Sequence, residues 1–151
     1  MMVIVVLLAT QCVSHAGTAS RMMVVSTVLR RAAGNVADVT VDMHGNIVCV
    51  AYTDNTIQRL VPNGTLELVA GQSGDLGDTN GVGGAAKFNN PWGITSNTVN
   101  NIAFVSDSGN NAIRAINLTS TLVTTLVGPT TAQPFGIVYL RGVLYAAGPR
   151  S

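Results

Sequence analysis

Three short apolar runs between Phe88 and Gly128 decide the fold: FNNPWGI at 88–94, AFVSDSGNNAIRAI at 103–116 and LVTTLVG at 122–128. Glycine, asparagine and serine separate the runs, and valine, isoleucine and threonine are frequent within them. This pattern is typical of consecutive strands joined by tight turns and not of a helix. We therefore expect an antiparallel meander of short strands in this stretch.

Weaker copies of the stretch lie on both sides of it. The earlier copy predicts strands at 39–42, 47–51, 56–60 and 66–71, and it is offset by 56 residues, so that Ala51 aligns with Asp107 and Ile57 with Ile113. A later copy begins at Pro134, 43 residues after Pro91, and runs to its second strand. A repeating unit of four short strands is the sequence pattern of a propeller blade. We predict blades at about 35–71 and 88–128, and a truncated one at 133–151.

The middle copy resembles the NHL-repeat β-propeller family. The resemblance rests on PWGI at 91–94, on VSDSGNNAIRAI at 105–116 and on the glycine-rich linker from Gly71 to Phe88. The outer copies depart from it, because Ala51 and Gly148 stand where the family usually has Asp. The family implies an all-β fold of antiparallel four-stranded blades. We expect an open or partial β-propeller over residues 24–151, preceded by an N-terminal signal segment.

Within the middle copy, several residues have expected structural roles. Asp107 would accept hydrogen bonds from the turn after the second strand, and Gly109 would take a positive φ there. The side chains expected between neighbouring sheets are Ile94, Phe104, Ile113 and Ile116.

Composition places the chain among soluble globular proteins with a single core. It has 151 residues, of which 47% are hydrophobic and 10% charged, and a formal net charge of +1. Strong nucleic-acid binding uses about 6–10 phosphate contacts. The candidate cations Arg59, Lys87, Arg114 and Arg141 are too sparse for that. An RNA-binding propeller is therefore the less favoured alternative, and we expect no nucleic-acid partner.

The amino terminus has the pattern of a secretory signal. Apolar residues extend to Val13, and Ser14 and Ala16 supply small residues for cleavage, which predicts a signal peptide at 1–16. The apolar run is shorter than the roughly 20 residues of a membrane-spanning helix. We expect a protein with no stable membrane span that is secreted or held at the cell surface.

Export would make two sequons available for glycosylation, at Asn63 and Asn117. Both fall between the third and fourth strands of their units, so we expect the glycans at the sheet edge opposite the linker between units. Cys49 lies in the apolar run 47–51 and is interpreted as a buried hydrophobic residue. The alternative is a cross-link between chains.

The linker from Gly71 to Lys87 contains two formal ligand patterns. Gly81, Gly83 and Ala86 fit a dinucleotide fingerprint, but no strand leads into them and Pro91 follows before a helix could develop. Asp75, Asp78 and Asn80 lack the twelve-residue loop with a closing Glu that calcium sites use. We expect a flexible loop here, with no cofactor.

Catalytic residues are not clustered in the sequence. His44 is the only histidine after the predicted signal, whereas zinc sites and nucleophilic catalysis need several such groups. Resemblance to the amidating lyases that share this fold would imply several metal-binding histidines, which are absent. We therefore expect no enzyme activity and no metal, with His44 exposed in a turn. The alternative is a fragment of a propeller enzyme whose catalytic residues lie outside this chain.

The expected function is a non-catalytic protein-interaction or ligand-binding module. Recognition usually resides on loops of a rigid scaffold. A protein or carbohydrate partner would bind a polar loop face, within which Trp92 is either exposed or packed. The residues of this predicted face are Lys87, Asn89, Asn90, Trp92, Asp107, Asn110, Asn111 and Arg114. Open sheet edges also predict self-association.

Overall fold

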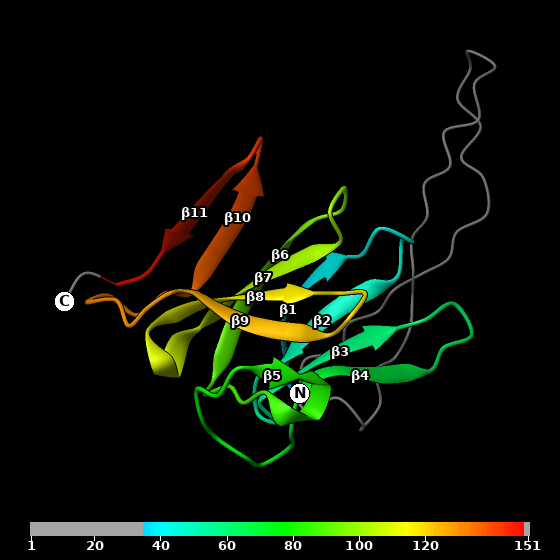
Figure 1. The fold of residues 1–151 in the computed structure, drawn as a ribbon, viewed down its shortest axis with the longest axis horizontal. Coiled ribbons are helices and arrows are strands. Elements are labelled where there is room, and N and C mark those ends of the chain that lie inside the picture. Colours follow the sequence, from blue (N-terminus) through cyan, green and yellow to red (C-terminus); the bar gives the residue numbers. More distant parts are fainter. Residues whose placement is uncertain (1–34, 150–151) are drawn as a thin grey trace. The chain divides into compact units, whose positions relative to one another are not determined.

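The computed structural model describes residues 35–149, which form antiparallel β-sheets (Figure 1). The predicted signal peptide at 1–16 lies outside the described residues. In the described part, no helix is long and apolar enough to cross a membrane.

The first sheet contains four strands in the order β1-β2-β3-β4. They are β1 (Val36–Val41), β2 (Ile47–Ala51), β3 (Thr56–Leu60) and β4 (Leu66–Gly71). Gly45, Asn55 and Gly64 have positive φ values of 79°, 56° and 85° in the three connecting turns. Glycine and asparagine tolerate this conformation, which explains why the chain reverses there.

The second sheet repeats this order and adds a short fifth strand. Its main strands are β6 (Pro91–Asn97), β7 (Ile102–Asp107), β8 (Ala112–Asn117) and β9 (Leu122–Val127). Strand β5 (Gly81–Val82) comes from the linker and pairs with β9. Two short 3₁₀ helices, η1 (Gly83–Ala85) and η2 (Ser108–Asn110), complete this part. The prediction of four-stranded antiparallel units is confirmed in both sheets.

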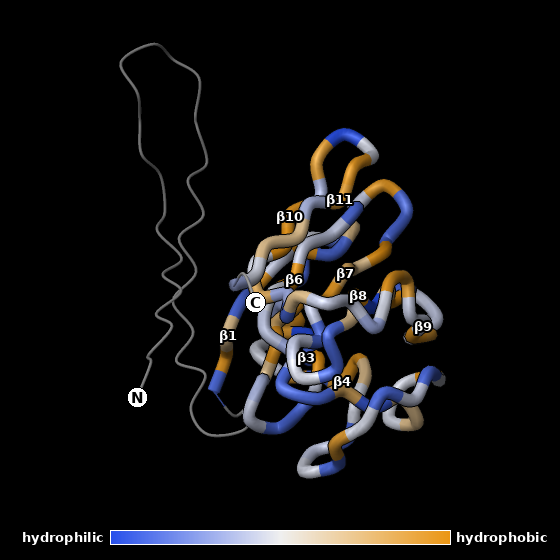
Figure 2. The backbone as a smooth tube through the Cα atoms, turned by 90° about the vertical axis from the view of Figure 1, so that its left-hand side faces the viewer, coloured by the Kyte–Doolittle hydropathy of each residue, from blue (hydrophilic) through white to orange (hydrophobic). Residues whose placement is uncertain are grey.

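A two-stranded hairpin follows the second sheet. It consists of β10 (Gly136–Leu140) and β11 (Val143–Ala147). Strand β1 packs against β6, and β6 packs against β10, so the first strands of the three units are neighbours in chain order. Figure 2 shows hydrophobic segments along the strands and hydrophilic ones at many of the turns.

The main core lies between the first and second sheets. Val48, Val50 and Ile57 from the first sheet belong to one cluster with Val105 and Ile116 from the second. Each side chain buried in this way contributes about 1.5–3 kcal/mol. Ile94, Ile113 and Ile116 are buried as the sequence predicted, while Phe104 is half-buried and stacks on Tyr139 with ring centroids 5.4 Å apart.

The predicted role of Gly109 is wrong. Asn111, not Gly109, takes the positive φ after β7, at 52°. Gly109 is needed for space, because a Cβ atom there would lie 2.6 Å from the backbone oxygen of Asn89. The backbone nitrogen of Gly109 donates to that same oxygen at 2.8 Å.

Candidate functional site

The linker before β6 is held by the guanidinium of Arg114. This side chain lies on β8 and is fully buried. Its Nη1 donates to the backbone oxygen of Lys87 at 3.0 Å and to Oδ2 of Asp107 at 2.8 Å. Its Nη2 donates to the backbone oxygen of Thr79 at 3.0 Å and to Oδ1 of Asn80 at 2.8 Å. One side chain therefore connects the linker to the centre of the second sheet.

Asp107 completes this network from the end of β7. It accepts hydrogen bonds from the backbone nitrogen of Asn89 and from Nδ2 of Asn110, both at 2.8 Å, in addition to that from Arg114. Burial raises the pKa of the Asp107 carboxyl, and the hydrogen bonds from Asn89, Asn110 and Arg114 oppose that rise. The predicted role of Asp107 as a hydrogen-bond acceptor for the turn after β7 is confirmed.

The structure corrects the predicted interaction face at two positions. Asp107 and Arg114 are each 0% exposed, so they cannot meet a partner at the surface. The physical reason is that Arg114 offers several donors, and the linker folds over β8 to supply acceptors for them. The linker is thus an ordered segment of the fold and not the flexible loop that the sequence predicted.

Most of the remaining polar side chains of the predicted face are also engaged in the fold. Nδ2 of Asn110 donates to the backbone oxygen of Gly77 at 2.7 Å. Asn111 is half-buried in its left-handed conformation. Nζ of Lys87 lies 2.8 Å from Oδ2 of Asp75, and both side chains are more than one-third exposed. An exposed ion pair of this kind contributes about 0.2–1 kcal/mol.

Trp92 of this face packs with two aromatic rings from outside it, and we call the three rings the aromatic cluster. Trp92 at the start of β6 lies between Tyr52, in the β2–β3 turn, and Phe135, just before β10. The Trp92 ring centroid is 5.2 Å from that of Tyr52 and 5.7 Å from that of Phe135. Trp92 is 42% exposed, and Tyr52 and Phe135 are half-buried. The cluster therefore combines tight packing with an open aromatic surface.

Polar residues of the segment before β6 adjoin Trp92 in the chain. Asn90 is exposed, and its backbone nitrogen donates to Oδ1 of Asn55 at 2.8 Å. Asn89 and Lys87 are half-buried. Four predicted face residues thus keep accessible surface in the segment 87–92: Lys87, Asn89, Asn90 and Trp92.

The sequence analysis missed two members of the aromatic cluster. Phe135 stands 43 residues after Trp92, the same offset that relates Pro134 to Pro91. The sequence therefore contained a signal for Phe135: an aromatic residue follows the proline at the start of both the second and the third unit. Tyr52 carried no such signal, because it lies in a turn and its proximity to Trp92 depends on how the sheets pack.

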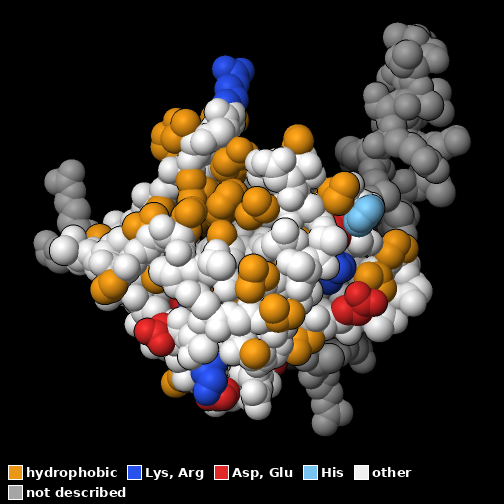
Figure 3. Space-filling view, viewed as in Figure 1, with side chains coloured by type: hydrophobic (Ala, Val, Ile, Leu, Met, Phe, Trp, Pro, Cys, Tyr) orange, Lys and Arg blue, Asp and Glu red, His pale blue; other side chains and the backbone are white. Residues whose placement is uncertain are grey.

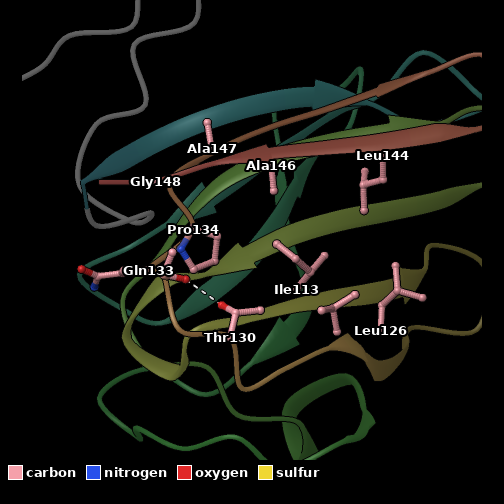
Figure 4. A pocket seen from close by; sticks show the side chains of 11 residues that line it. Ile113, Leu126, Thr130, Gln133, Pro134, Leu144, Ala146, Ala147 and Gly148 are labelled. Atoms are coloured by element: carbon pink, nitrogen blue, oxygen red, sulfur yellow. Dashed lines mark hydrogen bonds between the residues drawn. The ribbon is translucent and has the colours of Figure 1, made fainter. Parts of the chain in front are cut away.

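A separate apolar groove lies between the second sheet and the hairpin. Its volume is about 340 Å³. In Figure 4, Leu144 and Ala146 on β11 lie across from Ile113 on β8 and Leu126 on β9. Leu126 is 51% exposed. The groove offers an apolar surface with few polar groups, among them the hydroxyl of Thr130, which donates to the backbone oxygen of Asn111 at 2.9 Å.

The other candidate residues do not converge on a site. Within residues 35–149, no group of three or more His, Cys, Asp and Glu side chains could hold a metal ion. Asp75 pairs with Lys87 and Asn80 binds Arg114, so their side chains serve the linker. Cys49 is 1% exposed, and burial raises the pKa of its thiol to about 11.

The two sequon asparagines are exposed at turns, but their predicted separation from the linker is wrong for the second sheet. Oδ1 of Asn117 accepts a hydrogen bond from the backbone nitrogen of Thr119 at 2.9 Å. In the same turn, the backbone oxygen of Thr121 accepts a hydrogen bond from the nitrogen of Gly83 at 3.0 Å. The reason is that β5 pairs along β9 and carries the linker across to this edge. Asn63 lies in the corresponding turn of the first sheet.

Comparison with known proteins identifies the fold. No protein-family model matches the sequence, and no curated protein matches it. An auxiliary nutrient binding protein from Bacteroides thetaiotaomicron superposes with a TM-score of 0.63 at 18% identity, covering 80% of this chain and 36% of that one. A streptogramin B lyase superposes with a TM-score of 0.60 at 21% identity over 80% of this chain and 36% of that one. Virginiamycin B lyase from Staphylococcus aureus gives a TM-score of 0.57 at 16% identity over 80% and 37%.

These proteins are β-propellers, and the present chain spans less than half of their length. At these identities the likeness concerns the fold alone. Residues 35–149 thus have the fold of part of a β-propeller, in which the first sheet and the four main strands of the second sheet resemble two four-stranded blades, and the hairpin follows them.

Proposed function

We propose that this chain is a non-catalytic interaction module of the NHL-repeat type, and that it binds a protein partner through the aromatic cluster. The observation that carries this proposal is the 42% exposure of Trp92 between two supporting rings. Tryptophan and tyrosine are enriched among the residues that dominate binding energy at protein interfaces. Because neighbouring rings already hold Trp92, little side-chain entropy would be lost on binding.

The buried network beneath this face supports the proposal. Arg114 and Asp107 fix the segment that leads into β6, and Trp92 follows this segment as the second residue of β6. A rigid support keeps a binding surface in one conformation and lowers the cost of association. The polar groups of Asn90 and Lys87 would supply hydrogen bonds at the rim of the interface.

The proposal of a non-catalytic role rests on the ion pairing, protonation and exposure of the titratable groups in residues 35–149. Asp42 and Asp107 are buried in ion pairs with arginines. The raised pKa of Cys49 keeps its thiol protonated at neutral pH, so it is a poor nucleophile. His44 lies exposed in a turn between β1 and β2.

Export and glycosylation belong to the same proposal. The exposed side chains of Asn63 and Asn117 are accessible to an oligosaccharide transferase. We expect the natural protein to lose residues 1–16 and to lose further mass when treated with peptide N-glycosidase. Intact mass spectrometry before and after treatment tests this, and an unprocessed mass that does not change on treatment would contradict it.

Partner binding is tested by crosslinking at a chosen position. Tyr52→p-benzoylphenylalanine places a photoreactive ring inside the aromatic cluster, and Val99→p-benzoylphenylalanine places the same ring in the β6–β7 turn as a control. Val99 is 87% exposed and lies at the opposite end of β6 from Trp92. We expect the Tyr52 variant, and not the Val99 variant, to crosslink one extracellular protein, identified by mass spectrometry.

The affinity for that protein then decides the role of Trp92. We expect Trp92→Ala to weaken binding by at least about tenfold, and Trp92→Phe to weaken it less, because phenylalanine keeps part of the aromatic contact. Titration calorimetry with the purified partner measures both. Equal affinities of the wild type and Trp92→Ala would remove the aromatic cluster from the proposed function.

A further inference from the structure

The hairpin is apolar on both of its faces. On the inner face, Tyr139 stacks on Phe104, and its hydroxyl accepts a hydrogen bond from Nδ2 of Asn97 at 3.0 Å. The register pairs Val138 with Tyr145 and Leu140 with Val143, which puts these four residues together on the outer face. They are between 48% and 57% exposed. Strands with apolar residues on both faces are characteristic of sheets that are covered on both sides.

Figure 3 shows hydrophobic side chains gathered over the region of the hairpin and the neighbouring second sheet. We call Val138, Leu140, Val143 and Tyr145 the hairpin face. Contiguous apolar patches of this kind mark sites of protein association.

A second exposed apolar surface lies on β1. Thr40 points toward the second sheet, because its hydroxyl lies 2.9 Å from Oγ of Ser96. Val39 and Val41 alternate with Thr40 and therefore point away from the second sheet. They are 44% and 47% exposed. We call these two valines the β1 face.

The chain itself shows how two such faces pack, because it makes the same contact twice. In the first contact, Thr40 of β1 meets Ser96 of β6. In the second, Oγ1 of Thr95 on β6 accepts a hydrogen bond from the backbone nitrogen of Tyr139 on β10, at 3.1 Å. In each contact, every second residue of one unit's first strand faces the unit that follows. The residues between them face the unit before.

Within residues 35–149, no unit covers the hairpin face or the β1 face, and both faces lie at positions that take part in this repeated contact. Val138 corresponds to Thr95 at the offset of 43, so the hairpin face is the side that a following unit would cover. The strand register aligns β1 with β6. Val39 pairs with Cys49, and Ile94 pairs with Val105, the residue 56 positions after Cys49. Val39 thus corresponds to Ile94, on the side that packs against a preceding unit.

We propose that a second copy of this chain packs its β1 face on the hairpin face of the first, head to tail, and so repeats the contact between successive units. The contact is heterologous, because it joins two different surfaces of the same protein. It continues the packing of β1 on β6 and of β6 on β10. The proposal does not depend on the aromatic cluster.

Self-association of the full chain and of two single variants tests the proposal by sedimentation velocity over a wide range of concentrations. We expect Val138→Asp and Val39→Asp each to weaken self-association by at least about tenfold, because each places a charge in an apolar contact. Val99→Asp is the matched control, since it changes an exposed valine outside both faces. Its association should equal that of the wild type.

Mixing the two variants distinguishes a head-to-tail contact from a symmetric one. Val138→Asp retains an intact β1 face, and Val39→Asp retains an intact hairpin face, so an equimolar mixture should form a dimer that neither variant forms alone. Association of Val39→Asp at the wild-type level would mean that hairpin faces pair with each other, and would overturn the proposal. A wild-type chain that stays monomeric at all concentrations would also overturn it.

Two further measurements keep the result interpretable. Circular dichroism and urea unfolding report whether each variant is folded, and Val138→Thr and Val39→Thr replace the Asp variants if these do not fold. Trp92→Ala should leave self-association unchanged. Loss of self-association in Trp92→Ala would mean that the aromatic cluster forms the contact, and would overturn the assignment to the hairpin and β1 faces.

Discussion

The first and second sheets share one strand order, but their arginine–aspartate pairs lie at opposite ends of the strands. In the second sheet, Asp107 and Arg114 meet at the end that faces the linker, and both side chains are at most 1% exposed. The corresponding residues of the first sheet, 56 positions earlier, are Ala51 and Gln58. Gln58 donates a hydrogen bond from its side chain to the hydroxyl of Thr56 at 2.9 Å.

The charge pair of the first sheet lies at the β1–β2 turn. Nε of Arg59 is 3.1 Å from Oδ2 of Asp42, and Nη2 of Arg59 donates to the backbone oxygen of Leu118 at 2.6 Å. Asp42 also accepts hydrogen bonds from the backbone nitrogens of His44 and Asn46, both at 2.9 Å. This pair therefore holds a short turn and contacts the second sheet.

The comparison shows that the strand repeat and the polar contacts follow different requirements. Apolar alternation is kept in both sheets because both contribute to one core. The charge pair of the second sheet lies beside the long linker between Gly71 and Pro91, and Arg114 binds that linker. The charge pair of the first sheet stands where a turn of a few residues must be held.

The largest expected effect comes from breaking the pair in the second sheet. We expect Arg114→Ala to lower the free energy of unfolding by about 3–5 kcal/mol, because it leaves the Asp107 carboxylate buried without its cation. Gln58→Ala, at the corresponding position of the first sheet, should cost about 1 kcal/mol, the usual contribution of one hydrogen bond. Urea unfolding followed by the fluorescence of Trp92 measures both.

A double variant sharpens this result. Asp107→Ala combined with Arg114→Ala should cost less than the sum of the two single changes, because both single variants break the same contact. Equal losses for Arg114→Ala and Gln58→Ala would show that the linker does not depend on the guanidinium.

A smaller effect is expected at a glycine position that repeats in the hairpin. A Cβ atom at Gly93 would lie 2.3 Å from the backbone oxygen of Phe135, whereas a Cβ atom at Gly136 would meet nothing within 4 Å. We expect Gly93→Ala to lower the free energy of unfolding by about 1–3 kcal/mol through overpacking. Gly136→Ala is the matched control, 43 residues later, and should lose no stability in thermal unfolding. A loss of stability in both variants would mean that these positions need glycine for its backbone conformation and not for the space that it leaves.

The charge pair of the first sheet predicts a dependence on pH. Burial alone would raise the pKa of Asp42, but hydrogen bonds from Asn46 and His44 and the charge of Arg59 outweigh it and lower the pKa below the ordinary value of 3.8. The resulting stabilisation is present at pH values above 3.8 and is lost as the pH falls through the lowered pKa. We therefore expect Asp42→Asn to flatten the fall in stability of the wild type in acid, measured by urea unfolding at a series of pH values.

Asp78→Asn is the control for this prediction, since Asp78 is exposed and its replacement removes the same formal charge. If Asp42→Asn lost stability in acid as steeply as the wild type and Asp78→Asn do, Asp42 would not be the group responsible.

The smallest effect is expected at Cys49, which corresponds to Val105 in the second sheet. We expect Cys49→Val to change the free energy of unfolding by less than about 1.5 kcal/mol, because the repeat already accommodates valine at this place. The pKa of about 11 and the burial of the thiol also predict that iodoacetamide does not modify Cys49 in the folded protein. Peptide mapping after labelling in buffer and in urea tests this, and rapid modification in buffer would show that the strand opens.

The sequence predicted the strands, the turns and the repeat because these depend on neighbours in the chain. Alternation of apolar residues and the positions of glycine and asparagine are local features, and the sheets follow them. The predicted interaction face was less accurate. Asp107 and Arg114 have the residue types of a polar surface, and no local pattern indicates that a linker will cover them.

By itself, the sequence determined that this chain folds into antiparallel units of four short strands, because side-chain alternation and turn chemistry act over a few residues. Only the tertiary structure decided which polar residues are buried and which aromatic residues meet. The linker acceptors of Arg114 lie 27 to 35 residues before it in the chain. Tyr52, Trp92 and Phe135 come together only when three successive units pack. Burial and contact at this range depend on how complete sheets stack, which no short stretch of sequence specifies.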